Sequence, residues 1–510
     1  MTTHLHNVAF GIALSALATV AHADTDFVFT ESDRVDADHI IVFASDAALT
    51  GKMAAELDDE AGGGVAKALS AADFGGGFGE TLSLYGIGDA ARVTVIGTGD
   101  EALTLRQLHD LGGHVAMAAG ASDSVAVMVD TLDTSASHPA AELAAGYGLG
   151  SYSFTTYKSD AEESDQTVTF VTNGARAAGR AFDSDHAYLV EGVNMVRDLG
   201  NEPGKSVYPE EFVQRVRTAF RGVPGVKIKV YGNEEMERLN MGAITGVGRG
   251  SEHDPRMMII EYMGGDRGEA PVALVGKGIT FDTGGISLKP NNGQWLMKSD
   301  LSGAAAVAGT LFAAASRDAD VNVVGIMPLA ENMPDGRAIR PGDVLTTYNG
   351  TTIEVMSTDA EGRLLLADAV AYAQDKYEPE LLVDIATLTG SAGRALSDEY
   401  AAVITRDFGL AQEMMAIGER SGEDVWPLPL HPNHYDQIKS DIADIKSTAG
   451  NPGASIGAAV VGTFVDEDQA WVHLDIAGVD WRDSATPTMP KGHAGWGVRF
   501  MSELLRSLED

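Results

Sequence analysis

Short apolar runs alternate with longer helical stretches along most of the chain. In the first third, Ile-Ile-Val-Phe at 40–43 and Val-Thr-Val-Ile at 93–96 are typical of buried strands. The segment 103–119 spaces its apolar residues as a helix does. Because strands and helices alternate, this region predicts an α/β domain with a central sheet.

A second alternating region begins with a helical pattern over 175–199, which Asn-Glu-Pro-Gly at 201–204 ends. Its strands are expected at 257–262, 272–275, 321–326, 381–385 and 471–474, and its helices at 303–315, 364–375 and 500–508. The polar stretch 158–166 separates the two regions. We therefore predict an α/β fold of two domains. They are a smaller N-terminal α/β domain over 24–170 and a larger C-terminal one over 171–510, with a central mixed sheet flanked by helices.

The first residues resemble a signal peptide. Residues 9–21 are uncharged and mostly apolar, and Ala21-His22-Ala23 is a small-x-small cleavage site before Asp24. This pattern predicts a signal peptide over 1–23 and a periplasmic or secreted protein. No Lys or Arg precedes the run, so a cytoplasmic protein with an apolar first segment is the alternative. The run is too short to span a bilayer, and no later apolar stretch is long enough.

Charge and cysteine content narrow the possible chemistry. Lys and Arg number 36 against 74 Asp and Glu, for a net charge of −38. Such a surface repels phosphate and anionic lipid, so no nucleic-acid or membrane partner is expected. The charge identifies no substrate, and adaptation of solubility to a salty medium is its simplest explanation. The chain has 0 cysteines, which excludes disulfides, thiolate nucleophiles and Cys-based zinc sites. A metal must bind carboxylates, His, amines or backbone oxygens.

Two segments combine glycines with charged residues where a predicted strand runs into a loop, which is where α/β sheets bind ligands. They are Val-Gly-Lys-Gly-Ile-Thr-Phe-Asp-Thr-Gly-Gly-Ile-Ser-Leu-Lys at 275–289 and Ser-Thr-Asp-Ala-Glu-Gly-Arg-Leu at 357–364. The first holds Lys277, Asp282 and Lys289. Its glycines allow the backbone to approach a bound group closely.

The second segment has the spacing of a carboxylate pair. An extended backbone would project Asp359 and Glu361 to one side, and Arg363 would continue the alternation before a helix begins. Together with Asp282, these carboxylates could hold two cations about 3.5–4 Å apart. Asp300, ahead of a Gly- and Ala-rich helix, can add a fourth carboxylate.

Simpler interpretations of the same residues exist. Asp359 and Glu361 could cap the following helix, since acids favour helix N-termini. Lys277 could be a surface or ion-paired lysine, because a protonated amine cannot bind metal. It becomes a ligand only where neighbouring cations and desolvation keep it neutral.

The second segment resembles the signature Asn-Thr-Asp-Ala-Glu-Gly-Arg-Leu of the leucyl aminopeptidase family. The first is similar to that family's Gly-Lys-Gly-(Leu/Ile)-Thr-Phe-Asp-Ser-Gly-Gly-Ile-Ser-(Ile/Leu)-Lys block. Further similar stretches lie at 331–334, 340–344, 386–390, 439–444 and 473–478. The resemblance covers nearly all of the second domain, whereas the first is similar only in its general α/β character. Ser357 and Thr283 depart from the family's usual Asn and Ser.

The resemblance implies a pair of divalent cations. Carried over residue by residue, Lys277, Asp282, Asp300 and Glu361 would bind one cation. Asp282, Asp359 and Glu361 would bind the other, with Asp282 and Glu361 bridging. The family's metals make Zn²⁺ or Mn²⁺ the expected cations, with Co²⁺ or Mg²⁺ as further candidates.

The resemblance also implies roles around the metals. Lys289 would polarise the scissile carbonyl, and Arg363 would hold a bicarbonate ion that acts as general base. Met297, Thr387 and Gly390 would line the pocket for the first side chain. The implied activity is hydrolysis of the N-terminal peptide bond of peptides, with leucine or other apolar residues first and a metal-bridging hydroxide as nucleophile. A homohexamer, a dimer of trimers, is the implied assembly.

Two other functions are compatible with parts of the pattern. Another two-metal hydrolase such as a phosphoesterase could use the same carboxylates, although the chain has no Gly-rich phosphate cradle. A structural or DNA-binding role is the second, since some relatives of the family bind DNA. DNA binding needs a basic stripe, and the sequence has no Lys/Arg-rich run.

Overall fold

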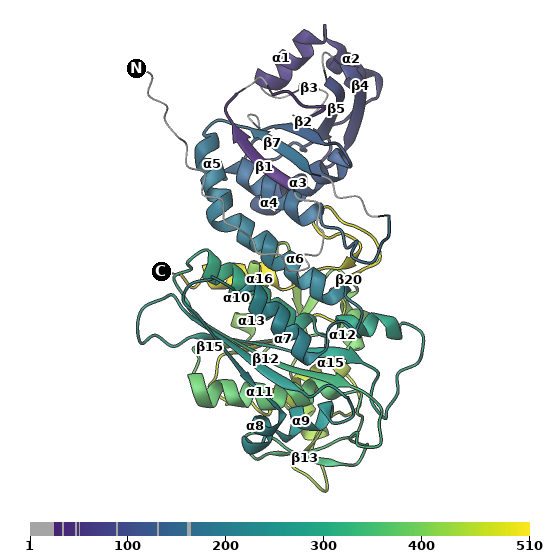
Figure 1. Ribbon diagram of the computed structural model, residues 1–510, viewed down its shortest axis with the longest axis vertical. Coiled ribbons are helices and arrows are strands. Elements are labelled where there is room, and N and C mark those ends of the chain that lie inside the picture. Colours follow the sequence, from purple (N-terminus) through teal and green to yellow (C-terminus); the bar gives the residue numbers. More distant parts are fainter. Residues whose placement is uncertain are drawn as a thin grey trace, which may run out of the picture.

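The computed structural model describes residues 25–32, 35–45, 48–49, 52–87, 90–129, 132–160 and 165–509. The segment predicted as a signal peptide, 1–23, lies outside these residues. The described chain forms a smaller N-terminal domain and a larger C-terminal domain, and one long helix runs from the first into the second (Figure 1). The predicted α/β fold with two domains is therefore confirmed.

The N-terminal domain is built on one sheet in the order β1-β7-β6-β2-β5-β4, with β3 beside β2. Only β3 and β4 run antiparallel to their neighbours. Its strands are β1 (Thr25–Thr30), β2 (His39–Ser45), β3 (Ala48–Leu49), β4 (Thr81–Ile87), β5 (Ala90–Gly97), β6 (Ser124–Met128) and β7 (Gln166–Val171). α3 (Leu105–Ala119) and α4 (Pro139–Gly150) cover one face, and α1 (Lys52–Glu60) and α2 (Gly64–Ala71) cover the other. Burial on both faces explains the continuous apolar run of β2.

The end of the first domain lies later than the polar stretch suggests. β7 follows the stretch 158–166 and pairs with both β1 and β6. The N-terminal sheet therefore extends to Val171. The long helix comes next as three consecutive parts, α5 (Ala175–Ala181), a π-helical turn η1 (Phe182–His186) and α6 (Ala187–Asn201).

The C-terminal domain contains a larger mixed sheet in the order β17-β16-β19-β15-β10-β12-β9-β8, with β11 beside β12. Its strands are β8 (Val226–Tyr231), β9 (Arg256–Met263), β10 (Val272–Gly276), β11 (Gly278–Asp282), β12 (Asn322–Asn332), β15 (Leu381–Ala386), β16 (Ala401–Ile404), β17 (Val425–Pro427) and β19 (Trp471–Asp475). β10, β12, β15 and β19 are parallel, so their carboxyl ends share one edge. Two small sheets add β13 (Val344–Thr346), β14 (Thr352–Glu354), β18 (Ile445–Lys446), β20 (Trp481–Arg482) and β21 (Gly492–His493).

Helices cover both faces of this sheet (Figure 1). One apolar core joins the sheet to α6, α7 (Pro209–Ala219), α10 (Ser302–Ser316), α13 (Phe408–Ser421) and α16 (Val498–Arg506). The opposite core joins it to α8 (Asn233–Arg238), α9 (Gly242–Gly248), α11 (Glu361–Tyr377) and α15 (Gly453–Gly462). The short elements η2 (Gln294–Ser299), α12 (Gly390–Leu396) and α14 (Pro432–Gln437) lie in connecting segments. In the described part of the chain, no helix combines the length and apolar character needed to cross a bilayer.

One local prediction is wrong at a position that matters for chemistry. The sequence pattern places 359–363 on an extended backbone, but α11 begins at Glu361, so Glu361 and Arg363 belong to its first turn. The apolar run Leu364–Leu366 is buried against the sheet, and an acidic residue in the first turn favours the helix N-terminus. The helix therefore starts earlier than the last polar residue of the motif.

Candidate active site

The predicted site residues gather at the carboxyl edge of the parallel strands. Lys277 lies between β10 and β11, Asp282 ends β11, and Glu361 opens α11. A cavity of about 500 Å³ opens at this edge. It is lined by every predicted site residue except Arg363, namely Lys277, Asp282, Lys289, Met297, Asp300, Asp359, Glu361, Thr387 and Gly390.

Lys277 is buried in a cage of acceptors. Its Nζ donates to Asp300 Oδ1 at 2.7 Å and to the Thr387 carbonyl at 2.8 Å, and it lies 2.9 Å from Glu361 Oε1. Burial alone would lower the pKa of Lys277, but the surrounding carboxylates outweigh it and raise the pKa above its usual value. A Cβ on Gly362 would lie 2.7 Å from Lys277 Cδ, which explains the glycine there. Lys277 is therefore no surface lysine, but it is ion-paired with Asp300 and Glu361, which is the other form of the simpler interpretation.

Lys289 joins the carboxylates of the two motifs. Its Nζ lies 2.8 Å from Asp282 Oδ2 and 2.7 Å from Asp359 Oδ1. The side chain keeps 22% of its surface exposed, so it reaches the cavity. The loop that carries it turns at Gly284, which has φ 88° and where a Cβ would meet Asp359 Oδ1 at 2.8 Å.

The carboxylates have free oxygens suited to cations. One oxygen each from Asp282, Asp359 and Glu361 lies within 4.8 Å of the other two. Among the described residues, Asp300 Oδ2 and Glu361 Oε2 are buried without a hydrogen-bond partner. Burial raises the pKa of Asp282 and of Asp300. Unpaired buried carboxylate oxygens are costly, and divalent cations would satisfy them, so the residues present fit a metal pair.

The helix-capping alternative does not match the geometry. The N-cap of α11 is Ala360, and no side chain caps the helix. The Asp359 carboxylate instead pairs with Lys289. Arg363 is buried behind the site, where its Nη1 donates to the Ser447 carbonyl at 2.9 Å. Its Nε has no hydrogen-bond partner among the described residues.

Three further residues contribute to the site although the sequence did not indicate them individually. Asn332, at the end of β12, donates from Nδ2 to Asp282 Oδ1 at 2.8 Å. Asp475 accepts from the Thr389 hydroxyl at 2.6 Å and holds the loop after β15. Both lie in stretches that resemble the family, 331–334 and 473–478. This resemblance was the feature of the sequence that could have indicated them. Trp481 lines the cavity, and no pattern indicates it.

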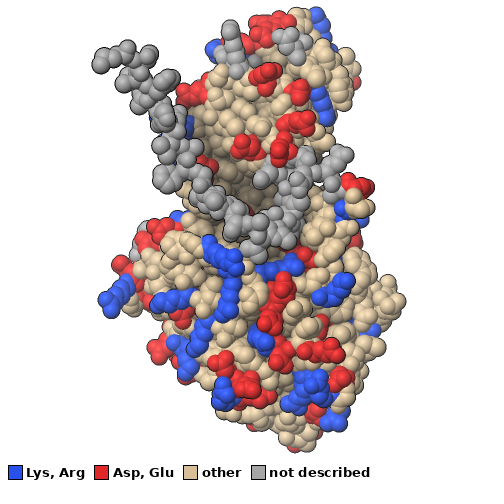
Figure 2. Space-filling view, in the orientation of Figure 1, with Lys and Arg blue, Asp and Glu red and all other residues tan. Residues whose placement is uncertain are grey.

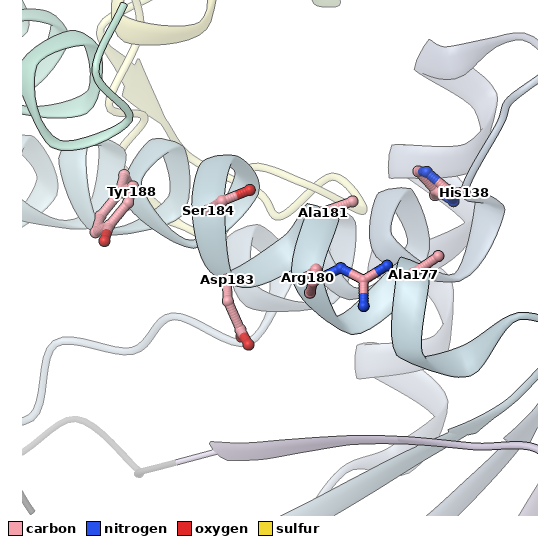
Figure 3. Close-up of a pocket in the computed structure, with 7 residues that line it drawn as sticks. All are labelled: His138, Ala177, Arg180, Ala181, Asp183, Ser184 and Tyr188. Carbon is pink, nitrogen blue, oxygen red and sulfur yellow. The ribbon is translucent and has the colours of Figure 1, made fainter. Parts of the chain in front are cut away.

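A second cavity lies far from these groups. It has about 650 Å³ and runs along the long helix, where Figure 3 shows His138, Arg180, Asp183 and Tyr188 among its lining residues. Asp183 is its one acidic lining residue in the described chain, so this cavity offers no carboxylate cluster for a metal pair.

Two domains of one known family match the two domains of this chain. The catalytic domain of the cytosol aminopeptidase family matches residues 194–502, and the N-terminal domain of the same family matches residues 40–161. The chain belongs to the cytosol aminopeptidase family. It is a metal-dependent hydrolase of the aminopeptidase type, which decides against the phosphoesterase alternative. The N-terminal match also corrects the expectation that the first domain shares only its general α/β character with the family.

The similarity to relatives and to solved structures covers almost the whole chain. A probable cytosol aminopeptidase of Rhodopseudomonas palustris is 41% identical over 478 residues, covering 91% of this chain and 95% of the relative. One from Caulobacter vibrioides is 38% identical over 474 residues, with coverage of 91% and 95%. A mutant tomato leucine aminopeptidase superimposes with a TM-score of 0.85 at 30% identity, covering 96% of this chain and 98% of that one. The bottromycin maturation enzyme BotP in complex with Mn gives 0.81 at 32%, covering 93% and 100%.

Proposed function

We propose that this aminopeptidase hydrolyses the N-terminal peptide bond of peptides with two divalent cations bound at the carboxyl edge of the large sheet. The observation that carries the proposal is the carboxylate cluster of Asp282, Asp359 and Glu361, which has one oxygen from each residue within 4.8 Å of the other two. Glu361 Oε2 in this cluster and Asp300 Oδ2 beside it are buried without a partner among the described residues. Lys277, Asp282, Asp300 and Glu361 would hold one cation. Asp282, Asp359 and Glu361 would hold the other.

The bound cation pair would supply a bridging hydroxide as nucleophile and an anchor for the free α-amine of the substrate. The Lys289 ammonium faces the cavity beside Asp282 and Asp359, where it would polarise the scissile carbonyl and stabilise the developing oxyanion. Arg363 would hold bicarbonate as general base, which is supported by its buried Nε without a partner among the described residues.

Apolar first residues are the proposed substrates. Met297, Thr387 and Gly390 line the cavity, and Leu296 and Trp481 add apolar surface. Such a wall stabilises a bound leucine side chain through burial. Zn²⁺ or Mn²⁺ are the proposed cations, with Co²⁺ or Mg²⁺ as alternatives, and the manganese in the BotP complex supports a first-row metal.

The assembly and the location of the chain are further proposals. A homohexamer, a dimer of trimers, rests on the family resemblance, and light scattering coupled to size exclusion would measure it. The relatives carry the name cytosol aminopeptidase, which favours the cytoplasmic alternative over export. N-terminal sequencing of the native protein distinguishes them, because export predicts a first residue of Asp24 and a cytoplasmic protein starts at Met1 or Thr2.

The activity is tested with three substrates of matched length. A free leucyl peptide should be cleaved, whereas the same peptide with an acetylated N-terminus and an aryl phosphate ester should not. Exhaustive chelation should abolish cleavage and added Mn²⁺ or Zn²⁺ should restore it. Cleavage of the acetylated peptide, or full activity with metal confirmed absent, would contradict the proposal.

A further inference from the structure

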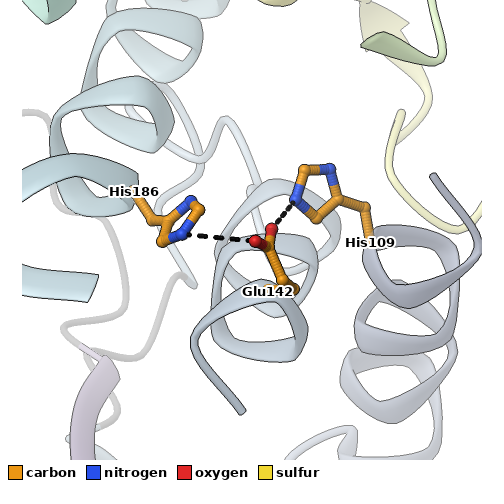
Figure 4. Close-up of side chains that lie close together, drawn as sticks. All are labelled: His109, Glu142 and His186. Atoms are coloured by element: carbon orange, nitrogen blue, oxygen red, sulfur yellow. Dashed lines mark hydrogen bonds and ion pairs between the residues drawn. The ribbon is translucent and has the colours of Figure 1, made fainter. Parts of the chain in front are cut away.

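A second cluster of potential metal ligands lies in the N-terminal half, away from the carboxylate centre. It consists of His109 on α3, Glu142 on α4 and His186 at the end of the π-helical turn η1 (Figure 4). His109 Nε2 lies 2.8 Å from Glu142 Oε2, and His186 Nε2 lies 3.6 Å from Glu142 Oε1. One ligand atom from each residue lies within 4.8 Å of the others. Figure 4 shows both rings directed at the carboxylate between them.

The first two ligands are fixed by an unusually close helix crossing. A Cβ on Gly146 would lie 2.0 Å from the His109 carbonyl oxygen, and one on Gly112 would lie 2.1 Å from the Leu143 carbonyl oxygen. α3 and α4 therefore touch through their backbones, and only glycine fits at these positions. This contact sets the separation of the His109 and Glu142 side chains without any help from a bound group.

The third ligand, His186, is held in place by a contact with the C-terminal domain. η1 is a π-helical turn in an otherwise α-helical run, a feature that is frequent at functional sites. Asp185 in this turn forms an ion pair with Arg506 of α16, with Oδ2 and Nη1 2.9 Å apart. The turn that presents His186 is thus held against the C-terminal domain.

The ring of His109 has one nitrogen that is available for the ring proton. His109 Nδ1 has no hydrogen-bond partner within the described chain, so no contact prevents this nitrogen from carrying the ring proton while Nε2 binds a metal.

We propose that His109, Glu142 and His186 bind one further divalent cation of the zinc type, separate from the catalytic pair. Two imidazole nitrogens and one carboxylate oxygen are a ligand set for zinc, and a water fills the fourth position. With bonds of about 2.1 Å at tetrahedral angles, neighbouring ligand atoms lie roughly 3.4 Å apart. The candidate ligand atoms already lie within 4.8 Å of one another, so a bound cation would draw them together by at most about 1.4 Å.

The bound cation joins the N-terminal domain to the long helix. Its ligands come from two helices that cover the N-terminal sheet and from the helix that continues into the catalytic domain (Figure 1). Because η1 is also paired with α16, the cation fixes the junction between the domains rather than the chemistry at the carboxylate centre.

X-ray absorption spectroscopy of the zinc-loaded full-length enzyme separates this site from the catalytic one. None of the described residues that line the catalytic cavity is a histidine. Imidazole scattering around zinc therefore reports the proposed site alone. We expect this scattering in the wild type, and we expect its absence, with one Zn²⁺ fewer per chain, in His109→Gln and in His186→Gln.

The controls keep the result interpretable if a variant folds poorly. His138→Gln changes a histidine at the start of α4 that lines the separate cavity of Figure 3, and it should keep the wild-type zinc content. Glu142→Gln keeps the shape of the side chain and should weaken zinc binding at least tenfold by calorimetry, with peptide hydrolysis unchanged. Zinc without imidazole scattering in the wild type, or unchanged zinc content in all three cluster variants, would overturn the proposal.

Discussion

The two ligand clusters of this aminopeptidase are built in opposite ways. At the carboxylate centre, the proposed ligands come from the ends of β10 and β11, the turn before α10 and the start of α11. Lys277 and Lys289 form ion pairs with the carboxylates. At the junction cluster of His109, Glu142 and His186, three helices meet, and one carboxylate faces two imidazoles without any lysine among the cluster's members. The first has more acidic groups than its lysines can satisfy, since two buried oxygens stay unpaired within the described chain.

This difference determines how easily each cluster can be predicted from the sequence. Strand ends place nearby residues of the chain in one site, so most of the carboxylate centre lies in two contiguous motifs, with Asp300 added from the segment between them. A helix crossing places residues together that are 33 positions apart, as for His109 and Glu142. The contrast also predicts how each cluster responds to substitution.

The largest effect is expected for the shared ligands. Asp282→Ala and Glu361→Ala should each lower kcat/KM by about 10³-fold or more, because losing the cations removes several kcal/mol of transition-state stabilisation. Metal at the carboxylate centre should fall to near zero while the junction cluster keeps its zinc. Steady-state kinetics with elemental analysis measures both quantities.

The control for these variants lies on the same helix as Glu361. Asp375→Ala removes an exposed carboxylate at the far end of α11 and should leave rate and metal content unchanged. Two tightly retained cations in Asp282→Ala would show that the bridging assignment is wrong.

A somewhat smaller effect is expected for Lys289→Ala. The ammonium faces the cavity and pairs with two carboxylates, so its loss should cut kcat by about 10²–10³-fold. The metal content of the carboxylate centre should stay constant, because removing a positive charge leaves the carboxylates more attractive to cations. Parallel loss of metal and rate would make Lys289 a ligand instead.

Sequence patterns predicted most strands of the C-terminal sheet, and together with the family resemblance they named nine of the residues that line the catalytic cavity. They failed at the start of α11, because the burial of Leu364–Leu366 against the sheet extends the helix back to Glu361, which the spacing of Asp359 and Glu361 does not indicate. Trp481 could not be predicted, since it reaches the cavity from a segment more than a hundred residues beyond the second motif. The junction cluster could not be predicted from the sequence, because it depends on a helix crossing in which Gly146 approaches His109 closely in the folded chain.

A moderate effect is expected from the residue that orients Asp282. Asn332→Ala removes the hydrogen bond to Asp282 Oδ1 and should weaken metal binding by about 10–100-fold, as is usual for groups that hold a metal ligand in place. At saturating metal, the loss in kcat should be far smaller than in Asp282→Ala. Metal titration monitored by recovered activity measures the shift, and the junction cluster provides the internal reference.

The last expected effect separates the two clusters by pH. Without cations, the carboxylates around Lys277 raise its pKa, so the ammonium form prevails near neutral pH. Coordination by the amine must release that proton, so zinc affinity at this centre should rise by up to about tenfold per pH unit. Activity should therefore have an alkaline optimum and be weak below about pH 6, where the proposed hydroxide nucleophile would also be disfavoured.

The junction cluster should respond differently, because burial lowers the pKa of His186. A lowered histidine pKa means that the ring is already neutral, so zinc binding displaces no proton from it above that pKa. Each cluster can be measured alone, in Asp282→Ala for the junction and in His109→Gln for the carboxylate centre, by competition with a chelating dye from about pH 7.5 to about pH 9, where histidine side chains are ordinarily neutral. We expect the zinc affinity to rise with pH in His109→Gln and to stay nearly constant in Asp282→Ala. A flat profile in His109→Gln would mean that Lys277 binds no metal through its amine.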